Sequence, residues 1–143
     1  MNLYARRGRL WLLVPAFLAV ISDMSITLLG QPAAYWTDSY RIVNEWNPIA
    51  RWFLTTHPLM FLVYFIIDAV VLIVLVFLLP DILAKMLSAL YTLSSANCVN
   101  LWLSGPFHKN IWISNIPLVI ASIVLVLAFE LVSRTKNSPA DGR

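Results

Sequence analysis

The amino-acid sequence predicts an all-α membrane protein: four transmembrane helices in two antiparallel hairpins, with a short interfacial helix in the first outer loop. Of the 143 residues, 60% are hydrophobic and 12% are charged, whereas a soluble domain is about half apolar and about a quarter charged. A span of the roughly 30 Å hydrocarbon layer needs about 20 mostly apolar residues. Four segments meet that need, at about residues 10–29, 59–79, 82–103 and 112–132.

The first span follows a basic anchor, residues 1–9, and this start also resembles a signal peptide. A cleaved signal usually has an apolar core of only about 7–15 residues. Here the apolar run continues to about Leu29, so we expect a retained first span. Neither the anchor nor the polar tail, residues 134–143, has the composition of a domain, and residues 1–143 are expected to form a single transmembrane domain.

The loop over residues 30–57 is the only connection long enough to have its own structure. Asn47 is suited to cap a helix, and Pro48 suits the first helical position because its missing N–H has no partner to lose. A short helix over about residues 48–56 follows from this signal. One mostly apolar face has helical spacing, with Arg51 and Thr55 on the other side, and this pattern favours a helix lying in the headgroup plane; the face consists of Ile49, Trp52, Phe53 and Thr56.

The second and third spans are joined by a short turn in which Pro80 ends one helix and Asp81 favours the start of the next. The sequence therefore predicts a tight antiparallel hairpin. Gly105 and Pro106 mark the turn before the fourth span. Small residues let helices approach closely in lipid, and the third span carries Ala84, Ser88, Thr92 and Ser95. This pattern predicts a central third helix, with the second and fourth spans facing lipid.

The basic residues are distributed unequally between the two sides of the predicted bundle. Lys and Arg concentrate on the cytoplasmic side of membrane proteins, so both termini are expected to be cytoplasmic, in a bacterial or archaeal cytoplasmic membrane. Glu130 and Arg134 have the favourable order for a helical ion pair. The basic residues are not gathered into one patch of the size that nucleic-acid binding needs, so nucleic acid is not an expected partner. Lipids and other membrane subunits are the expected partners. The basic residues expected on the cytoplasmic side are Arg6, Arg7, Arg9, Lys85, Arg134, Lys136 and Arg143. Those expected on the outer side are Arg41, Arg51 and Lys109.

Polar residues inside the spans form the candidate site. An aspartate near the bilayer centre costs roughly 2.5–3.5 kcal/mol on insertion scales, so it usually faces the bundle interior. When depth is assigned from the predicted orientation, polar residues of three spans converge on the outer side, beneath the loop that carries Glu45 and Asn47. The predicted cluster consists of Asp23, Thr27, Glu45, Asn47, His57, Tyr64, Asp68, Asn97 and Asn100.

Each residue of this cluster also has a structural interpretation. Asp23 with Thr27 and Asn97 could serve as interhelical hydrogen-bonding residues, Asn47 as a helix cap, and His57 as an interfacial side chain. The single cysteine, Cys98, allows no intramolecular disulfide and suits an apolar filler.

The two aspartates inside the spans allow more than one chemistry. If Asp23 and Asp68 approach each other, the pair could relay protons, bind a cation or activate water. The Tyr-Asp and Gly-x-Gly-Asp motifs of presenilin-type proteases are absent. Glu45 and His57 would complete a set of acceptable metal ligands, but the spacing is not that of a known zinc motif, and no cofactor is indicated.

The pattern Asp23-x3-Thr27, Gly30 and Glu45-x-Asn47-Pro48, with a third span that ends near Asn100, resembles a family of small prokaryotic integral membrane proteins. That family is classed as a domain of unknown function, with D-x3-T in the first helix and E-x-N-P after it. The resemblance covers roughly residues 10–103. It implies that the polar cluster acts as a unit but implies no activity. Members often carry a lysine in the second span, where this chain has Asp68, so no charge pair with Asp23 is implied.

Three functions are consistent with these features. The first is an accessory or assembly subunit of a larger membrane complex, favoured by apolar helix faces and by the lack of a soluble domain or a complete catalytic constellation. The alternative is a transporter-like protein that binds an ion or small molecule through Asp23 and Asp68. The third is a membrane-embedded enzyme.

Overall fold

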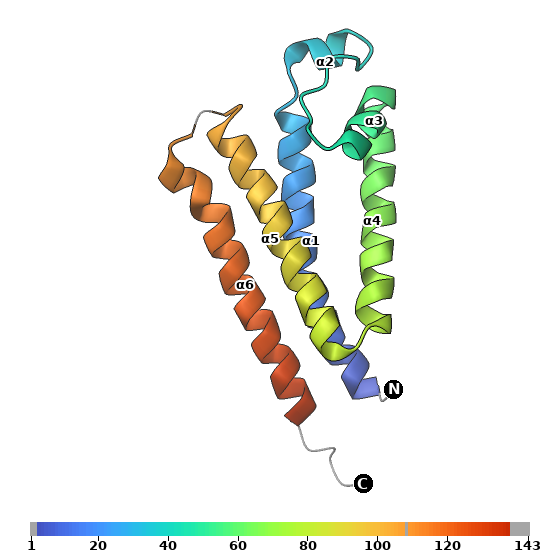
Figure 1. The fold of residues 1–143 in the computed structure, drawn as a ribbon, viewed down its shortest axis with the longest axis vertical. Coiled ribbons are helices and arrows are strands. Elements are labelled where there is room, and N and C mark those ends of the chain that lie inside the picture. The colour runs from blue at the N-terminus through green and yellow to red at the C-terminus, as the bar shows by residue number, and fades with distance from the viewer. Residues whose placement is uncertain (1–2, 108, 138–143) are drawn as a thin grey trace.

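The computed structural model describes residues 3–107 and 109–137, which contain helices and no strands. The predicted fold class is confirmed, because four of these helices are long and apolar enough to cross a membrane. His108 and the part of the predicted polar tail beyond residue 137 lie outside the described residues. In chain order the helices are α1 (Leu3–Leu29), α2 (Ala33–Thr37), α3 (Pro48–Thr56), α4 (Pro58–Leu78), α5 (Asp81–Ser104) and α6 (Ile111–Asn137) (Figure 1).

The helix boundaries agree closely with the predicted ones for α3, α4 and α5, and differ at the two ends of the chain. α1 begins before the predicted residue 10, and α6 continues past residue 132. Both extensions are polar, because a helix can continue beyond the apolar segment that spans the lipid. Its backbone hydrogen bonds do not depend on the side chains being apolar.

Both ends of the described chain lie at the same end of the bundle. The start of α1, the end of α6 and the turn between α4 and α5 form this terminal end, and α2 and α3 lie at the opposite, loop end (Figure 1). This arrangement agrees with an even number of spans. That the terminal end is cytoplasmic stays a prediction.

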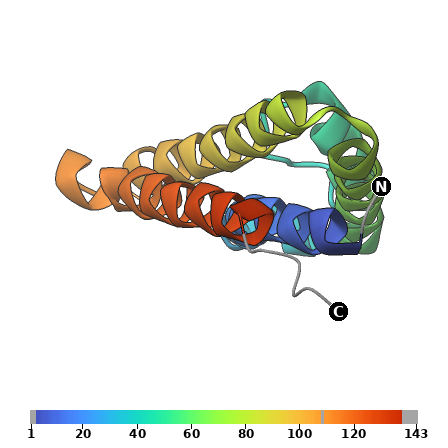
Figure 2. The same ribbon diagram turned by 90° about the horizontal axis from the view of Figure 1, so that it is seen from below.

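The four long helices do not pack equally. α1, α5 and α6 contact one another extensively, whereas α4 contacts α1 and α5 over a shorter stretch. Seen from the terminal end, α4 and α6 lie on opposite sides of α1 and α5 (Figure 2). The prediction of a tight hairpin was wrong beyond the turn, because α4 and α5 diverge towards the loop end (Figure 1). α1 shares the central position predicted for α5 and is the more buried of the two.

At the terminal end the helices form an apolar core, which we call the packed half. Small residues allow the close approach of α5 to α1: Ala16, Ala84 and Ser88 are fully buried. The Ser88 hydroxyl donates to the carbonyl oxygen of Leu12 at 2.5 Å, so a polar group inside this contact has its partner on the neighbouring helix. The core of the packed half consists of Leu12, Leu13, Ala16, Leu72, Val76, Ala84 and Val132.

Two ion pairs at the terminal end differ in their surroundings. Arg9 is nearly buried, and its guanidinium donates to Asp81 at 2.8 Å and to two backbone carbonyls in the last turn of α4 at 3.0 and 2.8 Å. It thereby joins α1 to the end of α4 and the start of α5. The predicted pair between Arg134 and Glu130 is confirmed at 3.0 Å, but both side chains are mostly exposed.

At the loop end, the segment between α1 and α4 folds onto the bundle. Tyr35 of α2 is fully buried and donates its hydroxyl to the carbonyl oxygen of Leu54 in α3 at 3.1 Å. Burial raises the pKa of Tyr35 to about 12, with a smaller contribution from Tyr40, so the hydroxyl keeps its proton. Gln31 accepts from the backbone N–H of Asn44 at 2.9 Å and donates to its carbonyl at 3.2 Å. These bonds hold the returning loop against the end of α1.

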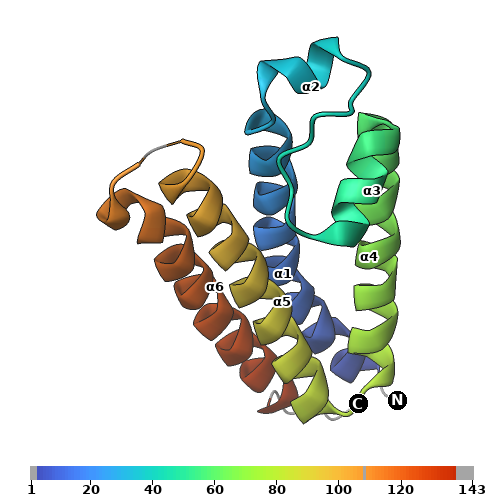
Figure 3. The same ribbon diagram turned by 45° about the horizontal axis from the view of Figure 1, so that its top comes forward.

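Helix α3 has the predicted bounds and folds back along the first turns of α4 (Figure 3). Its buried face is Ala50 and Leu54, which pack against Phe61 of α4. Ile49 and Trp52, from the predicted apolar face, are exposed. That these two side chains contact lipid headgroups stays a prediction.

Candidate ligand-binding cavity

A cavity of about 390 Å³ lies between α1, α4, α5 and the segment that leads into α3. It occupies the part of the molecule where α4 has diverged from α5, and we call this part the cavity half. Residues from three of the candidate membrane spans line the cavity. The cavity is therefore bounded mainly by segments of candidate membrane-spanning helices.

The α1 wall carries Asp23 and Thr27, which share a face because they are four residues apart. Thr27 is buried and lies close enough to interact with the Asp23 carboxyl group. Glu45 is also near enough for its charge to act on Asp23. Two acidic groups from distant parts of the chain thus lie together in the cavity.

The E-x-N-P motif forms the second wall of the cavity, and the hydrogen bonds of this turn show why it needs these residue types. Glu45 Oε1 accepts from the backbone N–H of Asn47 at 2.7 Å. Asn47 Oδ1 in turn accepts from the N–H groups of Ile49 and Ala50 at 3.0 and 3.3 Å, while Pro48 occupies the first helical position. The predicted helix cap is therefore confirmed. The same turn brings Glu45 and Asn47 to the cavity.

The third and fourth walls belong to α4 and α5. Tyr91 of α5 donates its hydroxyl to Asp68 of α4 at 3.0 Å, a bond between the two diverging helices. Tyr64, one turn before Asp68, lies beside the Asn47 side chain and lines the same cavity. Asp68 and Tyr64 therefore face the cavity together, in accordance with their spacing on one helix face.

Six of the nine residues of the predicted cluster line the cavity, and three do not. His57 is exposed at the junction of α3 and α4, where its Nδ1 accepts from the N–H of Leu59 at 3.1 Å. Its ring packs edge-on against Tyr40 with the centroids 5.0 Å apart. Asn97 is exposed, and Asn100 is half-buried away from the cavity. The six are Asp23, Thr27, Glu45, Asn47, Tyr64 and Asp68.

The error on α5 has a periodic cause. The side chains of α5 that line the cavity follow helical spacing; Asn100 is on the opposite face, and Asn97, seven residues after the cavity-lining Leu90, is at the edge of the face and outside the lining. The prediction chose Asn97 and Asn100 because they are polar, and polarity alone does not identify the side chains of α5 that line the cavity. The spacing could have been found from Tyr91, whose hydroxyl donates to Asp68 across the cavity half. The cavity-lining residues that the sequence analysis left out of the cluster include Tyr91, Ser94, Ser95, Cys98 and Trp102.

Gly30 has a packing role that its place in the sequence pattern did not reveal. A Cβ at this position would collide with the indole ring of Trp102, which lines the cavity. The backbone at Gly30 has no positive φ. Close approach to Trp102, and not an unusual backbone conformation, therefore requires glycine here.

The described cavity lining carries three acids, Asp23, Glu45 and Asp68, and no lysine, arginine or histidine. The ion pairs found among residues 3–107 and 109–137 involve other acids. In the same residues, no three His, Cys, Asp or Glu side chains lie close enough together to hold a metal ion. The metal set considered above fails because His57 lies at the loop end of α4, away from the cavity. The arrangement is a recess lined by acidic residues, without a compact metal site among the described residues.

No family model, curated protein or solved structure matched the chain in the comparisons made. The resemblance to the family with D-x3-T and E-x-N-P motifs therefore stays a prediction. What is shown is a protein with four candidate membrane-spanning helices that pack against one another, three of which line an acidic cavity.

Proposed function

We propose that this protein binds a small cationic molecule in the acidic cavity, as a multi-pass protein of a bacterial or archaeal cytoplasmic membrane. The observation that supports this function is the set of three acids in the cavity lining, with no basic residue among the described residues beside them. With both termini cytoplasmic, as the positive charges favour, the cavity would lie towards the outer side.

Electrostatics supports a cation as the ligand. An ionised carboxylate within the hydrocarbon layer is unfavourable by roughly 2.5–3.5 kcal/mol on insertion scales, so it usually has a partner. The partner of Asp68 is the neutral hydroxyl of Tyr91. The partner of Asp23 is Thr27, which is also neutral, and a second acid, Glu45, lies nearby. A bound cation would supply the opposite charge. The volume of about 390 Å³ suits a small molecule, since ligand pockets range over about 300–1,000 Å³.

The proposal is tested by thermal unfolding in detergent, with tetramethylammonium as the probe. The expected result is a rise in Tm that depends on the probe concentration for the unsubstituted protein and for Asp38→Asn, an exposed control at the loop end. Asp23→Asn and Asp68→Asn should each reduce that rise strongly, because each removes a cavity charge.

Two results would contradict cation binding. The first is the absence of any cation-dependent rise in the unsubstituted protein. The second is a failure of Asp23→Asn and Asp68→Asn to accumulate while Asp38→Asn accumulates normally, which would assign the two aspartates to the structure.

An accessory or assembly subunit is the second candidate function. It is supported by the large apolar surfaces that α4 and α6 leave exposed, since most of each span is unburied in the single chain. A neighbouring membrane subunit would cover one of these faces and lipid the other. Purification of the untagged chain in mild detergent should then recover it together with other membrane proteins in fixed proportion. A monodisperse monomer, purified untagged, would argue against it.

A further inference from the structure

A second recess, of about 450 Å³, lies next to the acidic cavity and shares part of its lining. Glu45, Cys98 and Trp102 line both spaces, which are therefore on either side of one wall. Beyond this wall the second recess is lined mainly by apolar groups, among them Trp46 and Leu101. A charged space and an apolar space thus adjoin each other at the end of α5.

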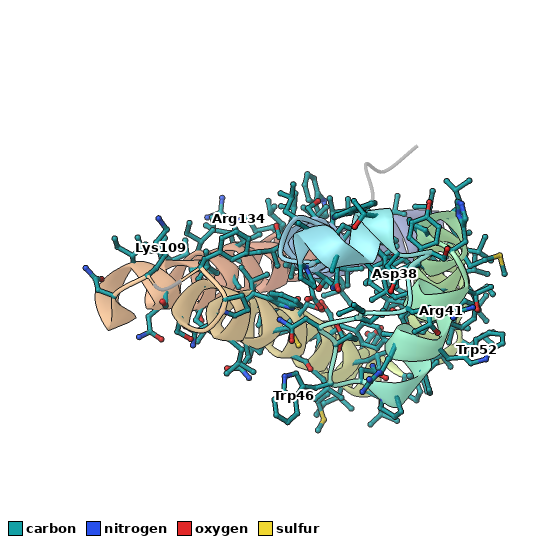
Figure 4. The ribbon with its side chains drawn as sticks, turned by 90° about the horizontal axis from the view of Figure 1, so that it is seen from above. Asp38, Arg41, Trp46, Trp52, Lys109 and Arg134 are labelled. Carbon is teal, nitrogen blue, oxygen red and sulfur yellow. The ribbon has the colours of Figure 1, made fainter. Side chains whose placement is uncertain are left out.

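Trp46 borders this second recess and is 95% exposed. Trp46 is the second residue of the E-x-N-P motif, and seen from the loop end it projects from the edge of the molecule (Figure 4). An indole ring so placed has no partner in the described part of the chain that buries it. Tryptophan favours the boundary between lipid and water. The recess therefore faces the surroundings of the bundle beside an amphipathic side chain.

Aromatic rings accompany the acids inside the cavity. Tyr64, Tyr91 and Trp102 line it together with Asp23 and Asp68. Aromatic faces attract ammonium groups, and quaternary ammonium ligands are commonly bound by aromatic side chains. A metal ion, by contrast, needs several donors converging at about 2–2.6 Å, and the acids here do not converge. The lining chemistry favours an organic cation over an inorganic one.

We infer that the ligand is an amphipathic organic ammonium ion, with its charged head in the acidic cavity and its apolar chain in the recess beside Trp46. This inference rests on the proposed cation-binding function and adds the chemical class of the ligand. The positively charged head lies near the carboxyl groups of Asp23, Glu45 and Asp68 and supplies the opposite charge. The apolar chain covers Leu101 and the face of Trp46. Both parts are required, because neither space alone matches an amphipathic molecule.

The test compares three probes by titration of the protein in lipid nanodiscs, with protein-free nanodiscs subtracted as the partitioning control. Octyltrimethylammonium should bind at least about tenfold more tightly than tetramethylammonium, because burying several methylene groups adds to the affinity. Octyl sulfate, which has the same chain and the opposite charge, should not bind specifically.

Substitutions separate the two parts of the ligand. Trp46→Ala should weaken octyltrimethylammonium binding about fivefold or more and leave tetramethylammonium binding unchanged, because only the chain lies beside this ring. Trp52→Ala is the matched control, since Trp52 is also exposed but does not line the recess. Asp23→Asn should weaken the binding of both cations.

Each outcome bears on a different statement. Equal affinities for the two cations, or an equal effect of Trp46→Ala and Trp52→Ala, would overturn the placement of the chain and leave the cation cavity standing. Octyl sulfate binding as tightly as octyltrimethylammonium would show that the chain alone drives binding and overturn the inference. No binding of either cation would overturn the proposed function as well.

Discussion

The packed half and the cavity half both contain segments of α1, α4 and α5, yet their polar groups have different kinds of partner. In the packed half, the Ser88 hydroxyl donates to a backbone carbonyl, and the terminal nitrogens of Arg9 donate to Asp81 and to the end of α4, although the buried Nε of Arg9 has no partner in the described part of the chain. In the cavity half, Asp23 and Glu45 are both acidic groups of the same cavity lining, near enough for the charge of Glu45 to act on Asp23, and no basic side chain of that lining lies between them.

The difference originates in what lies between α4 and α5. Near their turn, the bonds from Arg9 to the last turn of α4 and to Asp81 hold the two helices together. Farther along, α4 diverges, and the E-x-N-P segment and α3 occupy the space beside it. Membrane bundles pack closely where small residues meet, whereas irregular backbone at membrane depth is tolerated where protein or a cavity surrounds it. The polar cavity and the irregular segment therefore occur together.

The largest expected effect comes from Arg9→Ala, which tests the connection at the terminal end. It removes the hydrogen bonds to Asp81 and to the last turn of α4, and we expect a loss of about 3 kcal/mol in stability. The measurement is thermal or denaturant unfolding in detergent. Arg134→Ala is the control, and its exposed pair should account for less than about 1 kcal/mol. Equal losses for the two variants would show that Arg9 does not connect the helices of the packed half.

Gly30→Ala should have a smaller effect, at the border of the cavity half. The new Cβ would collide with the Trp102 ring, and overpacking of this kind typically destabilises by about 1–3 kcal/mol. Trp102→Leu in the same chain should restore most of the loss, because it removes the colliding ring. The two single variants and the double variant form a cycle that measures the contact. If the losses simply add, Gly30 is required for another reason.

The smallest expected effect is that of Asn47→Ala on the start of α3. Loss of a helix cap costs about 1 kcal/mol, and here it also releases the turn that holds Glu45 near Asp23. Asn47→Asp should keep the cap and most of the stability. Asn97→Ala, at an exposed position on α5, should change unfolding very little. A loss for Asn97→Ala as large as that for Asn47→Ala would contradict the assignment of the cap.

The sequence was sufficient for those features that depend on local chemistry. Apolar runs of the required length determine the spans, because lipid accepts few other segments. Asn47 followed by Pro48 determines the start of α3, since both residues satisfy its free backbone groups without distant partners. Glu130 and Arg134 pair because they are four residues apart on one helix.

Only the tertiary structure decided which helices diverge and which faces meet. Nothing in the turn at Pro80 shows that α4 and α5 separate, because their distance depends on Arg9, on Ala84 and on the segment packed beside them. For the same reason Tyr91 reaches Asp68 while Asn97 and Asn100 turn away. Helical periodicity orders the faces of one helix, but the rotation of each helix about its axis is set by its contacts with the others.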